Sequence, residues 1–424
     1  MHRRYSCSRM LFVCRFQHGY FCLSPPRRIF AHRGDSMSNS KGIVLLVAKS
    51  YPPVVGGVET YSESVARGYL RRNLIPIVLT QTAGDSGWRC ISYPEGVIRL
   101  FNTGPGKQSW VFARLLFEAA SVFRRERFTF VHATTWRPAL AICVFARKLP
   151  LVLTVHGREV MNYPWFLKHP MIGLLRRADV LAAVSSATME IAKTALHGRR
   201  PRGKWIVAFN GISYPDEARS FFRENSLPNA SINLLSLARL VPRKNVQACI
   251  QAIMELRDEG VTGFRYAIAG RGPMEMELKA TVRKNGLEDI VHFLGYVADR
   301  DLPSLYQAAD VFLHPQTNVG EGNDFEGFGL VIADAMSFGC AVLAGDAGGP
   351  RDFVTHNTTG ILADGMSSSE VKEAIRRLVT DTQLRRRLSS NGRAYALSEL
   401  SWDRHVEKIV QSLPGTSRLP NRPQ

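Results

Sequence analysis

Short apolar runs alternate with longer amphipathic stretches along most of the chain. Residues 42–48 form a continuous apolar run, and a stretch with helical spacing over 59–70 separates it from the next run, at 75–80. Strands that are apolar on both faces are typical of a parallel sheet covered by helices. The same pattern predicts further strands at 130–132, 151–155, 180–184 and 205–209, with helical segments between them.

The alternation of strands and helices begins again at residue 232. Such repetition requires right-handed crossovers and builds a parallel, doubly wound sheet. We therefore expect an α/β protein with two Rossmann-like halves that face each other across a cleft, with ligands at the carboxyl ends of the strands. In the second half the pattern predicts strands at 232–237, 265–269, 291–294, 311–314, 341–344 and 360–362, and helices at 246–259, 274–285, 301–308, 330–338 and 369–378.

The length of 424 residues fits two domains of about 200 residues each better than one compact core. The polar stretch 211–229, which contains two prolines, is the predicted linker. Residues 1–36 carry seven arginines and no sustained period, so we expect a disordered extension with Met37 as the working start. The expected domains are 37–212 and 213–400, followed by a helix over 401–413 and a tail over 414–424.

Positive charge is concentrated in the first half of the chain. The formal net charge is +19, and residues 37–212 hold 24 basic and 9 acidic side chains, a net charge of +15, whereas residues 213–424 have a net charge of −2. A one-sided positive field attracts phosphate-rich partners such as anionic membranes or phosphorylated substrates. We find no helix-turn-helix, zinc-finger or aromatic–basic RNA signature, and expect no nucleic-acid partner.

The cysteines and the hydropathy pattern indicate a cytoplasmic protein. The seven cysteines are scattered and form no CxxC pair, which fits free thiols in a reducing compartment. No run of about 18 uncharged apolar residues occurs, so no transmembrane helix is predicted. The segment 107–127 has helical spacing and combines Trp110 and Phe117 with several arginines. It is interpreted either as a helix that lies on anionic lipid or as a crossover helix with a solvated basic end.

The most specific segment is Phe325-Glu-Gly-Phe-Gly-Leu-Val-Ile-Ala-Asp-Ala-Met336. A glycine-flanked loop here opens a helix near Gly329, which leaves the backbone N–H groups of Phe328, Gly329 and Leu330 unpaired at the positive end of the helix. Those groups suit a phosphate or sugar hydroxyls. Glu326 supplies a hydrogen-bond acceptor for hydroxyls from the loop, and Asp334 lies within the helix.

Two further loops offer groups that bind phosphate. Ala238-Arg-Leu-Val-Pro-Arg-Lys-Asn245 follows the first strand of the second half, and its Arg239 and Lys244 can neutralise a diphosphate, with Arg243 as a candidate helper. In the first half, Gly57 precedes a helix whose N-terminus is suited to a donor phosphate.

The 325–336 segment resembles the Glu–x7–Glu motif of the GT-B glycosyltransferases grouped as family 4, the group 1 glycosyl transferases. The resemblance extends over about residues 41–413, and the members most similar in appearance are bacterial mannosyl- and related hexosyltransferases that build lipid-linked glycans. It implies the GT-B fold, a donor-binding second domain, an acceptor-side first domain, and a C-terminal helix that returns to the first domain.

The resemblance also implies roles for individual residues. His156, at the end of the strand 151–155, resembles the active-site histidine near the donor sugar, and Glu326 is expected to hold the sugar hydroxyls. Asp334 replaces the second glutamate of the motif, which holds the ribose, with a side chain one methylene shorter. Arg239 and Lys244 look like the diphosphate clamp, and the loop that contains Tyr296 resembles the one whose backbone recognises the base.

The predicted function is therefore a retaining, metal-independent glycosyltransferase of cell-surface polysaccharide or lipopolysaccharide synthesis. It would move a hexose, with mannose as one candidate, from a GDP- or UDP-sugar to a glycan or lipid-linked acceptor, as a cytoplasmic protein that can associate with the inner face of the plasma membrane. No side chain stands out as a covalent nucleophile, and nothing in the sequence demands a metal ion or a further cofactor. The alternatives are a GT-B sugar-nucleotide epimerase, a phosphorylase, and a non-catalytic protein that binds anionic surfaces.

Overall fold

The computed structural model describes residues 41–54, 56–82, 84–161, 163–221, 231–319 and 324–415. The predicted extension at 1–36 and most of the predicted tail lie outside these ranges. The described residues divide into two compact units, one within 41–132 and 141–149, and the other within 133–140 and 150–415.

The first unit is built on β1, β2 and β4, which are parallel, with β3 antiparallel to β4. Ile43 of β1 pairs with Ile75 of β2, and both strands are buried along nearly their whole length, as expected for the continuous apolar runs. The sequence analysis missed the β3–β4 hairpin. The elements are β1 (Ile43–Ala48), α1 (Gly57–Arg71), β2 (Ile75–Thr80), β3 (Gly87–Tyr93), β4 (Gly96–Asn102), α2 (Gln108–Arg125) and β5 (Phe128–Ala133).

The parallel strands β6, β7 and β8 follow β5 in the same sheet. The full eight-stranded order is β3-β4-β2-β1-β5-β6-β7-β8. The additional elements are α3 (Trp136–Ile142), β6 (Leu151–Val155), α4 (Arg158–Met161), the 3-10 helix η1 (Trp165–Leu167), α5 (Lys168–Arg177), β7 (Val180–Ala183), α6 (Ser186–Ala195), β8 (Lys204–Val207) and α7 (Pro215–Ser220).

The second sheet has six parallel strands in the order β11-β10-β9-β12-β13-β14. Its core joins strand residues such as Tyr266 and Val311 to helix residues such as Ile253 and Ile375, all fully buried. The two separate sheets confirm the prediction of two doubly wound halves. The elements are β9 (Ile232–Leu237), the 3-10 helix η2 (Pro242–Lys244), α8 (Val246–Asp258), β10 (Phe264–Ala269), α9 (Glu275–Lys284), β11 (Val291–Gly295), α10 (Leu302–Ala308), β12 (Val311–His314), α11 (Leu330–Ser337), β13 (Ala341–Gly345), β14 (Ile361–Ala363), α12 (Ser368–Thr380), α13 (Thr382–Glu399) and α14 (Trp402–Ser412).

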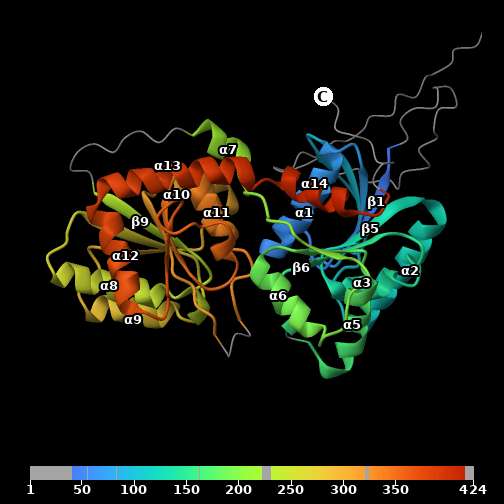
Figure 1. Ribbon diagram of the computed structural model, residues 1–424, viewed down its shortest axis with the longest axis horizontal. Helices are drawn as coiled ribbons and strands as arrows, with labels where there is room; N and C mark the ends of the chain where they lie inside the picture. Colours follow the sequence, from blue (N-terminus) through green and yellow to red (C-terminus); the bar gives the residue numbers. More distant parts are fainter. Residues whose placement is uncertain are drawn as a thin grey trace, which may run out of the picture. The chain divides into compact units, whose positions relative to one another are not determined.

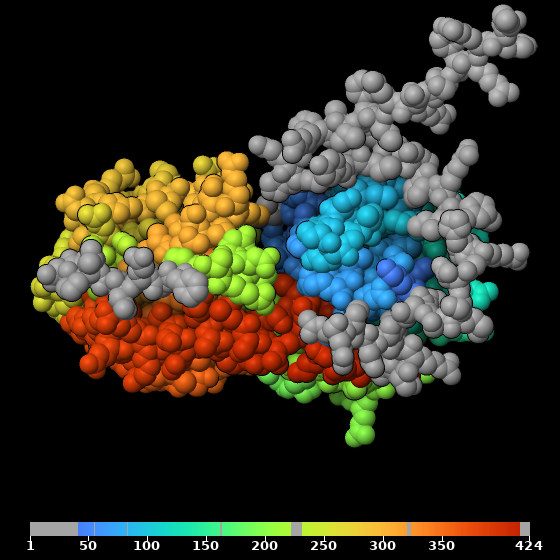
Figure 2. All heavy atoms as spheres, turned by 90° about the horizontal axis from the view of Figure 1, so that it is seen from above, coloured from blue at the N-terminus to red at the C-terminus, as the bar shows by residue number. Residues whose placement is uncertain are grey.

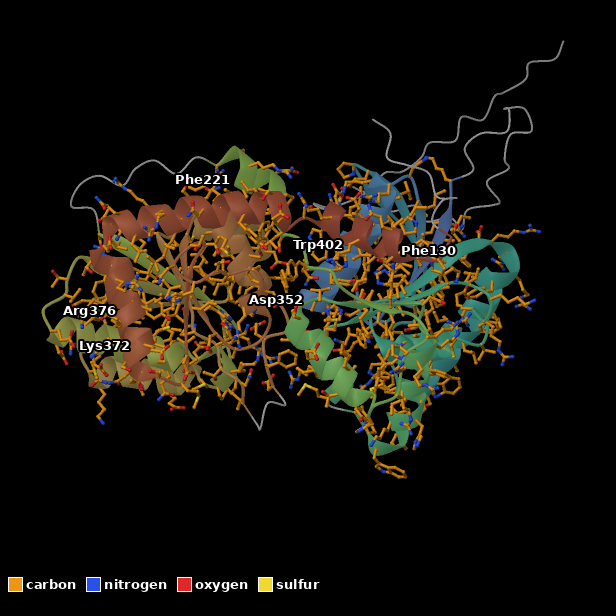
Figure 3. The ribbon with its side chains drawn as sticks, in the orientation of Figure 1. Phe130, Phe221, Asp352, Lys372, Arg376 and Trp402 are labelled. Carbon is orange, nitrogen blue, oxygen red and sulfur yellow. The ribbon has the colours of Figure 1, made fainter. Side chains whose placement is uncertain are left out.

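Helices α8 and α12 pack side by side on this sheet (Figure 1). Two cations of α12, Lys372 and Arg376, form ion pairs with Glu255 of α8 and with Glu259, the residue that follows α8, and both cations are marked in Figure 3. Such exposed pairs contribute little individually, so the apolar contacts beneath them hold the helices on the sheet.

Helices α13 and α14 lie at the surface of the second unit, in red in Figure 2. The sequence analysis did not predict α13, whose buried positions Leu384, Leu388, Gly392 and Ala396 recur every four residues within a polar sequence. Helix α14 packs against β7 and β8. Its Trp402, marked in Figure 3, donates its indole N–H to the carbonyl of Ile212 at 3.1 Å.

Candidate active site

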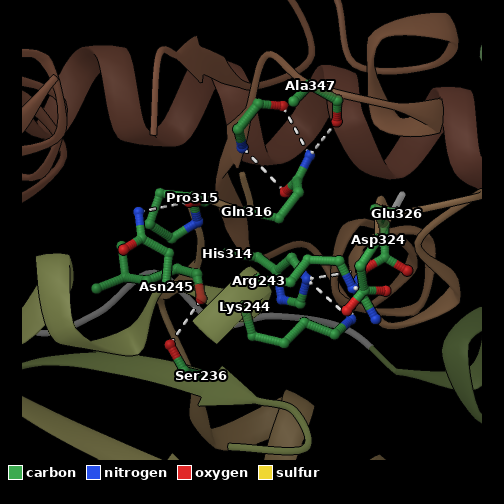
Figure 4. Close-up of polar contacts among 12 residues, drawn as sticks. Ser236, Arg243, Lys244, Asn245, His314, Pro315, Gln316, Asp324, Glu326 and Ala347 are labelled. Atoms are coloured by element: carbon green, nitrogen blue, oxygen red, sulfur yellow. Dashed lines mark hydrogen bonds and ion pairs between the residues drawn. The ribbon is translucent and has the colours of Figure 1, made fainter. Parts of the chain in front are cut away.

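Four charged or titratable side chains converge where β9 and β12 end. Arg243 and Lys244 lie in η2, shortly after β9, and His314 is the last residue of β12. Glu326 lies in the loop before α11, and Figure 4 shows the other three side chains directed at it. Because β9 and β12 are neighbouring parallel strands, their carboxyl ends share one edge of the sheet, which is where such folds bind ligands.

One oxygen of Glu326 is shared by both cations. Arg243 Nη1 donates to Glu326 Oε2 at 2.5 Å, and Lys244 Nζ donates to the same atom. His314 Nε2 lies 3.3 Å from Lys244 Nζ and 3.5 Å from Glu326 Oε2. Asp324 Oδ1 lies 3.2 Å from Arg243 Nε. We call Arg243, Lys244, His314 and Glu326 the charged cluster.

Burial and charge shift the titration of this cluster. Its side chains are only 1% to 13% exposed. Burial alone would raise the pKa of Glu326, but Lys244, the hydrogen bond to His314 and Arg243 hold it well below its usual range. Burial lowers the pKa of Lys244 despite its partner Glu326, and burial with the nearby Lys244 charge lowers the pKa of His314 to about 4. At neutral pH Glu326 is therefore a carboxylate and the imidazole of His314 is neutral.

The loops that carry the cluster are fixed by side-chain amides. Asn245 adopts a left-handed backbone with φ of 56°, and its Nδ2 donates to the carbonyls of Pro315 at 3.0 Å and Gly365 at 2.7 Å. Gln316 Nε2 donates to the carbonyls of Gly345 and Ala347, at 2.8 and 2.9 Å. These bonds (Figure 4) hold four chain segments together around the cluster without using its charges.

The start of α11 presents unpaired donors, as predicted. Gly329 precedes the helix with φ of 94°, and the N–H groups of Phe328, Gly329 and Leu330 have no acceptor among the described residues. The loop is held by Gly349, whose N–H donates to the carbonyl of Glu326 at 2.8 Å. A Cβ at Gly348 would lie 2.4 Å from that same carbonyl oxygen, so only glycine allows this approach.

His156 follows β6 and is half-buried. Its backbone N–H donates to Glu159 Oε1 at 2.7 Å, and its Nε2 lies 3.0 Å from the carbonyl of Thr134. Trp136 donates its indole N–H to the carbonyl of Glu159 at 2.8 Å. The sequence analysis did not single out Glu159 or Trp136. Glu159 lies three residues after His156. A glutamate at this spacing often caps the start of a helix, so the sequence could have indicated its role.

The remaining predicted residues lie at exposed or helix-start positions. Arg239 is exposed in the segment between β9 and η2. Tyr296 follows β11 with 60% of its surface exposed. Gly57, in the first unit, is the first residue of α1, and the acidic Glu59 stands in the same first turn.

Asp334 forms no hydrogen bond with the charged cluster among the described residues. It is 4% exposed within α11, and its Oδ1 accepts the N–H of Ser213 at 2.6 Å. Burial raises its pKa to about 7. Among the described residues no group of three or more His, Cys, Asp or Glu side chains is arranged to hold a metal ion.

Comparison with known proteins identifies the family. Residues 55–214 match the model of Glycosyltransferase Family 4, and residues 217–395 match that of Glycosyl transferases group 1. The chain belongs to the group 1 glycosyl transferases. Its sheets and helices are accordingly those of a glycosyltransferase with the GT-B fold.

Two curated relatives match this glycosyltransferase over most of their length. A GDP-mannose-dependent alpha-(1-6)-phosphatidylinositol monomannoside mannosyltransferase of Mycobacterium tuberculosis is 29% identical over 399 residues, covering 88% of this chain and 98% of the relative. A GDP-mannose-dependent monoacylated alpha-(1-6)-phosphatidylinositol monomannoside mannosyltransferase of Corynebacterium glutamicum is 23% identical over 393 residues, with the same coverage of both chains.

Solved structures share the fold. Anabaena HepE in complex with UDP and glucose superposes with a TM-score of 0.65 at 21% identity, covering 87% of this chain and 98% of HepE. WaaG, a glycosyltransferase involved in lipopolysaccharide biosynthesis, superposes with a TM-score of 0.64 at 18% identity, covering 88% and 100%. In the described part of this chain, no helix combines the length and the apolar character needed to cross a bilayer.

Proposed function

We propose that this glycosyltransferase moves a hexose from a nucleoside-diphosphate sugar to a glycan or lipid-linked acceptor, with retention of anomeric configuration and without a metal ion. The observation that carries the proposal is the pair of buried cations, Arg243 and Lys244, that share one oxygen of Glu326. The relatives that use GDP-mannose favour GDP-mannose as the donor and a phosphatidylinositol mannoside or similar lipid-linked glycan as the acceptor.

The cations stabilise the leaving group. As the bond between the anomeric carbon and the diphosphate oxygen breaks, negative charge grows on the diphosphate, and Lys244, Arg243 and Arg239 are fixed charges of the opposite sign. Such preorganised charge lowers the barrier most when it matches charge that develops in the transition state. Without a donor, Glu326 keeps the two cations in place; with the donor bound, it accepts hydrogen bonds from sugar hydroxyls.

The proposed displacement takes place on one face of the sugar. The acceptor hydroxyl oxygen forms the new bond to the anomeric carbon, the diphosphate leaves from the same face, and the hydroxyl proton passes to the departing phosphate oxygen. The unpaired N–H groups at the start of α11 bind the donor at a positive helix end. His156 stands near the donor sugar, the Tyr296 loop binds the base, and Asp334 binds the ribose.

The stereochemical test uses purified enzyme, GDP-mannose and a mannoside acceptor. The α-linked donor should give an α-linked product, read by NMR from the one-bond carbon–hydrogen coupling of the new anomeric centre. Turnover should be unchanged by an excess of EDTA, because Lys244, Arg243 and Arg239 supply the charge that a metal would otherwise supply. A β-linked product would exclude retention, and loss of turnover in EDTA that Mg²⁺ or Mn²⁺ restores would exclude metal independence.

The same assay separates the alternative enzymes. Conversion of the sugar nucleotide without any acceptor would indicate an epimerase, and dependence on free phosphate would indicate a phosphorylase.

We also propose that the enzyme docks on the anionic cytoplasmic face of the membrane through α2. The inner face of α2 is buried at Val111, Leu115 and Val122, whereas Trp110 and Phe117 on its outer face are 65% and 70% exposed. Exposed arginines at 114, 124, 125 and 127 accompany these aromatic rings. Exposed aromatic and basic side chains on one helix face are typical of a helix that lies in the membrane interface, and this combination supports the proposed docking.

Reversing Arg124, Arg125 and Arg127 to Glu should weaken binding to anionic vesicles by at least about tenfold, since each basic residue near such a surface is worth on the order of 1 kcal/mol. Binding of the unmodified enzyme, measured by vesicle sedimentation, should rise with the anionic lipid fraction and fall with added salt.

The matched control reverses Arg283, Lys284 and Arg300, which are exposed in the part of the chain that contains the six-stranded sheet. Equal losses in the two triple variants would show that only net charge matters and would contradict docking through α2.

A further inference from the structure

Alternate side chains of β3 face different helices. Trp88 donates its indole N–H to Glu118 Oε1 of α2 at 2.9 Å, whereas Tyr93 donates its hydroxyl to Glu63 Oε1 of α1 at 2.8 Å. Successive residues of a strand point to opposite faces of the sheet, so Arg89, four residues before Tyr93, shares the face of Tyr93. The side chain of Arg89 therefore lies on the α1 side of the β3–β4 hairpin.

The guanidinium of Arg89 has no acceptor within the described residues. Its Nε and Nη2 are enclosed and form no hydrogen bond. Burial lowers the pKa of Arg89, and the groups that oppose this shift are the phenols of Tyr51 and Tyr93, not a carboxylate. Burial in turn raises the pKa of both phenols, so they carry no charge at neutral pH. Because arginine stays protonated in proteins, Arg89 is a partly buried cation without a counter-anion.

The nearby carboxylates of the α1 side are already engaged. Glu95 Oε1 lies 2.9 Å from Arg67 Nη2 and 2.7 Å from Arg71 Nη1, and Glu63 accepts the hydroxyl of Tyr93. An enclosed cation that lacks a partner destabilises the fold. Groups that bind a ligand often carry such a cost, because the ligand supplies the missing partner.

Arg89 lies near the carboxyl edge of the first sheet. It pairs with Leu100 of β4, two residues before that strand ends at Asn102, and β2 ends beside Asn102, at Thr80. The carboxyl ends of parallel strands are where such folds bind ligands. The third nitrogen of Arg89, Nη1, is not one of the enclosed atoms, so an oxyanion at this edge can reach it.

A guanidinium without a carboxylate partner is suited to a phosphate, whose oxygens it binds through charge-assisted hydrogen bonds. The cations proposed for the donor diphosphate, Arg243 and Lys244, belong to the second compact unit, whereas Arg89 belongs to the first. The proposed lipid-linked acceptor has a phosphate of its own, in the diester that joins its glycan to the lipid. Arg89 is therefore a candidate partner for this second phosphate.

We propose that Arg89 binds the phosphodiester of the acceptor and thereby favours phosphate-bearing acceptors over neutral glycans. That the phosphodiester belongs to the acceptor rests on the proposed function, whereas the affinity of Arg89 for a phosphodiester does not. The bound phosphate supplies the missing counter-anion, and in this enclosed position the attraction is stronger than at a fully solvated arginine.

The first test needs no ligand and uses phosphate-free buffer. Arg89→Met keeps most of the length of the side chain and removes the uncompensated charge, so the Tm should rise by about 2 °C or more. The matched control is Arg99→Met on β4. Arg99 pairs with Glu126 at 2.7 Å and lies over the ring of Trp88, so its loss should lower the Tm. An unchanged or lower Tm in Arg89→Met would show that the protein itself compensates this charge and would overturn the proposal.

The second test measures the binding of glycerophosphoinositol and myo-inositol by calorimetry. Glycerophosphoinositol carries a phosphodiester without lipid chains, and the unmodified enzyme should bind it at least about tenfold more tightly than myo-inositol. Arg89→Met should lose this preference, Arg89→Lys should retain part of it, and Lys284→Ala should keep it in full. Equal affinity of the unmodified enzyme and Arg89→Met for glycerophosphoinositol would overturn the proposal.

Further outcomes separate the source of the phosphate and the proposed function from the Arg89 site. Inorganic phosphate that binds at Arg89 more tightly than glycerophosphoinositol would assign the site to free phosphate and contradict the acceptor. If the enzyme binds glycerophosphoinositol through Arg89 but transfers no sugar, the proposed function fails and the Arg89 site stands. If it transfers sugar while Arg89→Met binds glycerophosphoinositol as tightly as the unmodified enzyme, the Arg89 site fails alone.

Discussion

Replacing Lys244 by Ala is expected to lower kcat by about 10²- to 10³-fold, the loss typical for removing one preorganised group that stabilises transition-state charge. Lys244 donates to Glu326 and lies 3.3 Å from His314 Nε2, so its ammonium is buried among polar partners that fix its position. The charge it opposes grows as the diphosphate leaves, and the loss should therefore fall mainly on kcat, with a smaller change in the KM for the donor.

The control for this variant is Lys284→Ala, which removes an exposed lysine at the end of α9. Initial rates with saturating donor and acceptor should separate the two variants by at least tenfold. Equal rates for Lys244→Ala and Lys284→Ala would remove Lys244 from the catalytic machinery.

Replacing Glu326 by Gln should abolish most turnover and also destabilise the fold. Glu326 is the shared partner of Arg243 and Lys244, and removing one member of a buried ion pair leaves uncompensated charge, at a cost of about 3–5 kcal/mol. The donor sugar also loses its charged acceptor, so kcat/KM is expected to fall by about two orders of magnitude or more. Glu277→Gln, at an exposed position on α9, should have no measurable effect on stability or rate.

Binding of a nucleotide should restore part of the thermal stability that the Glu326→Gln variant loses. The phosphates of GDP or UDP bring negative charge to Arg243 and Lys244, so saturating nucleotide should raise the Tm of this variant more than that of the unmodified enzyme. A smaller increase in the variant would show that the phosphates do not meet these two cations.

Apolar runs were enough to predict the strands of both sheets other than β3 and β4, because strands buried on both faces need such runs. The β3–β4 hairpin was not predicted because β3, Gly87–Tyr93, is only partly buried and carries polar residues throughout. Helix α13 was not predicted for a related reason. Its buried positions lie four residues apart within an arginine-rich stretch and include Gly392, so its apolar face is hard to recognise in the sequence.

The family resemblance assigned Lys244 and Glu326 to one donor site but did not predict that they share an ion pair with Arg243. Their separation of 82 residues is closed only by the pairing of β9 and β12. His314 was missed because a single histidine at the end of an apolar strand has no motif around it. Asp334 was expected to serve the ribose, and its bond to the Ser213 N–H was not foreseen, since a backbone donor leaves no trace in the sequence.

The most direct test of the account is a calorimetric titration of the unmodified enzyme and of Lys244→Ala with GDP, UDP and the matching nucleosides. The account predicts that at least one diphosphate binds the unmodified enzyme much more tightly than its nucleoside does. It also predicts that Lys244→Ala loses at least about tenfold of that diphosphate affinity, as expected for a lost charge-assisted contact, while its nucleoside affinity is unchanged. Equal affinity of both proteins for the diphosphate would contradict the assignment of the charged cluster to the donor.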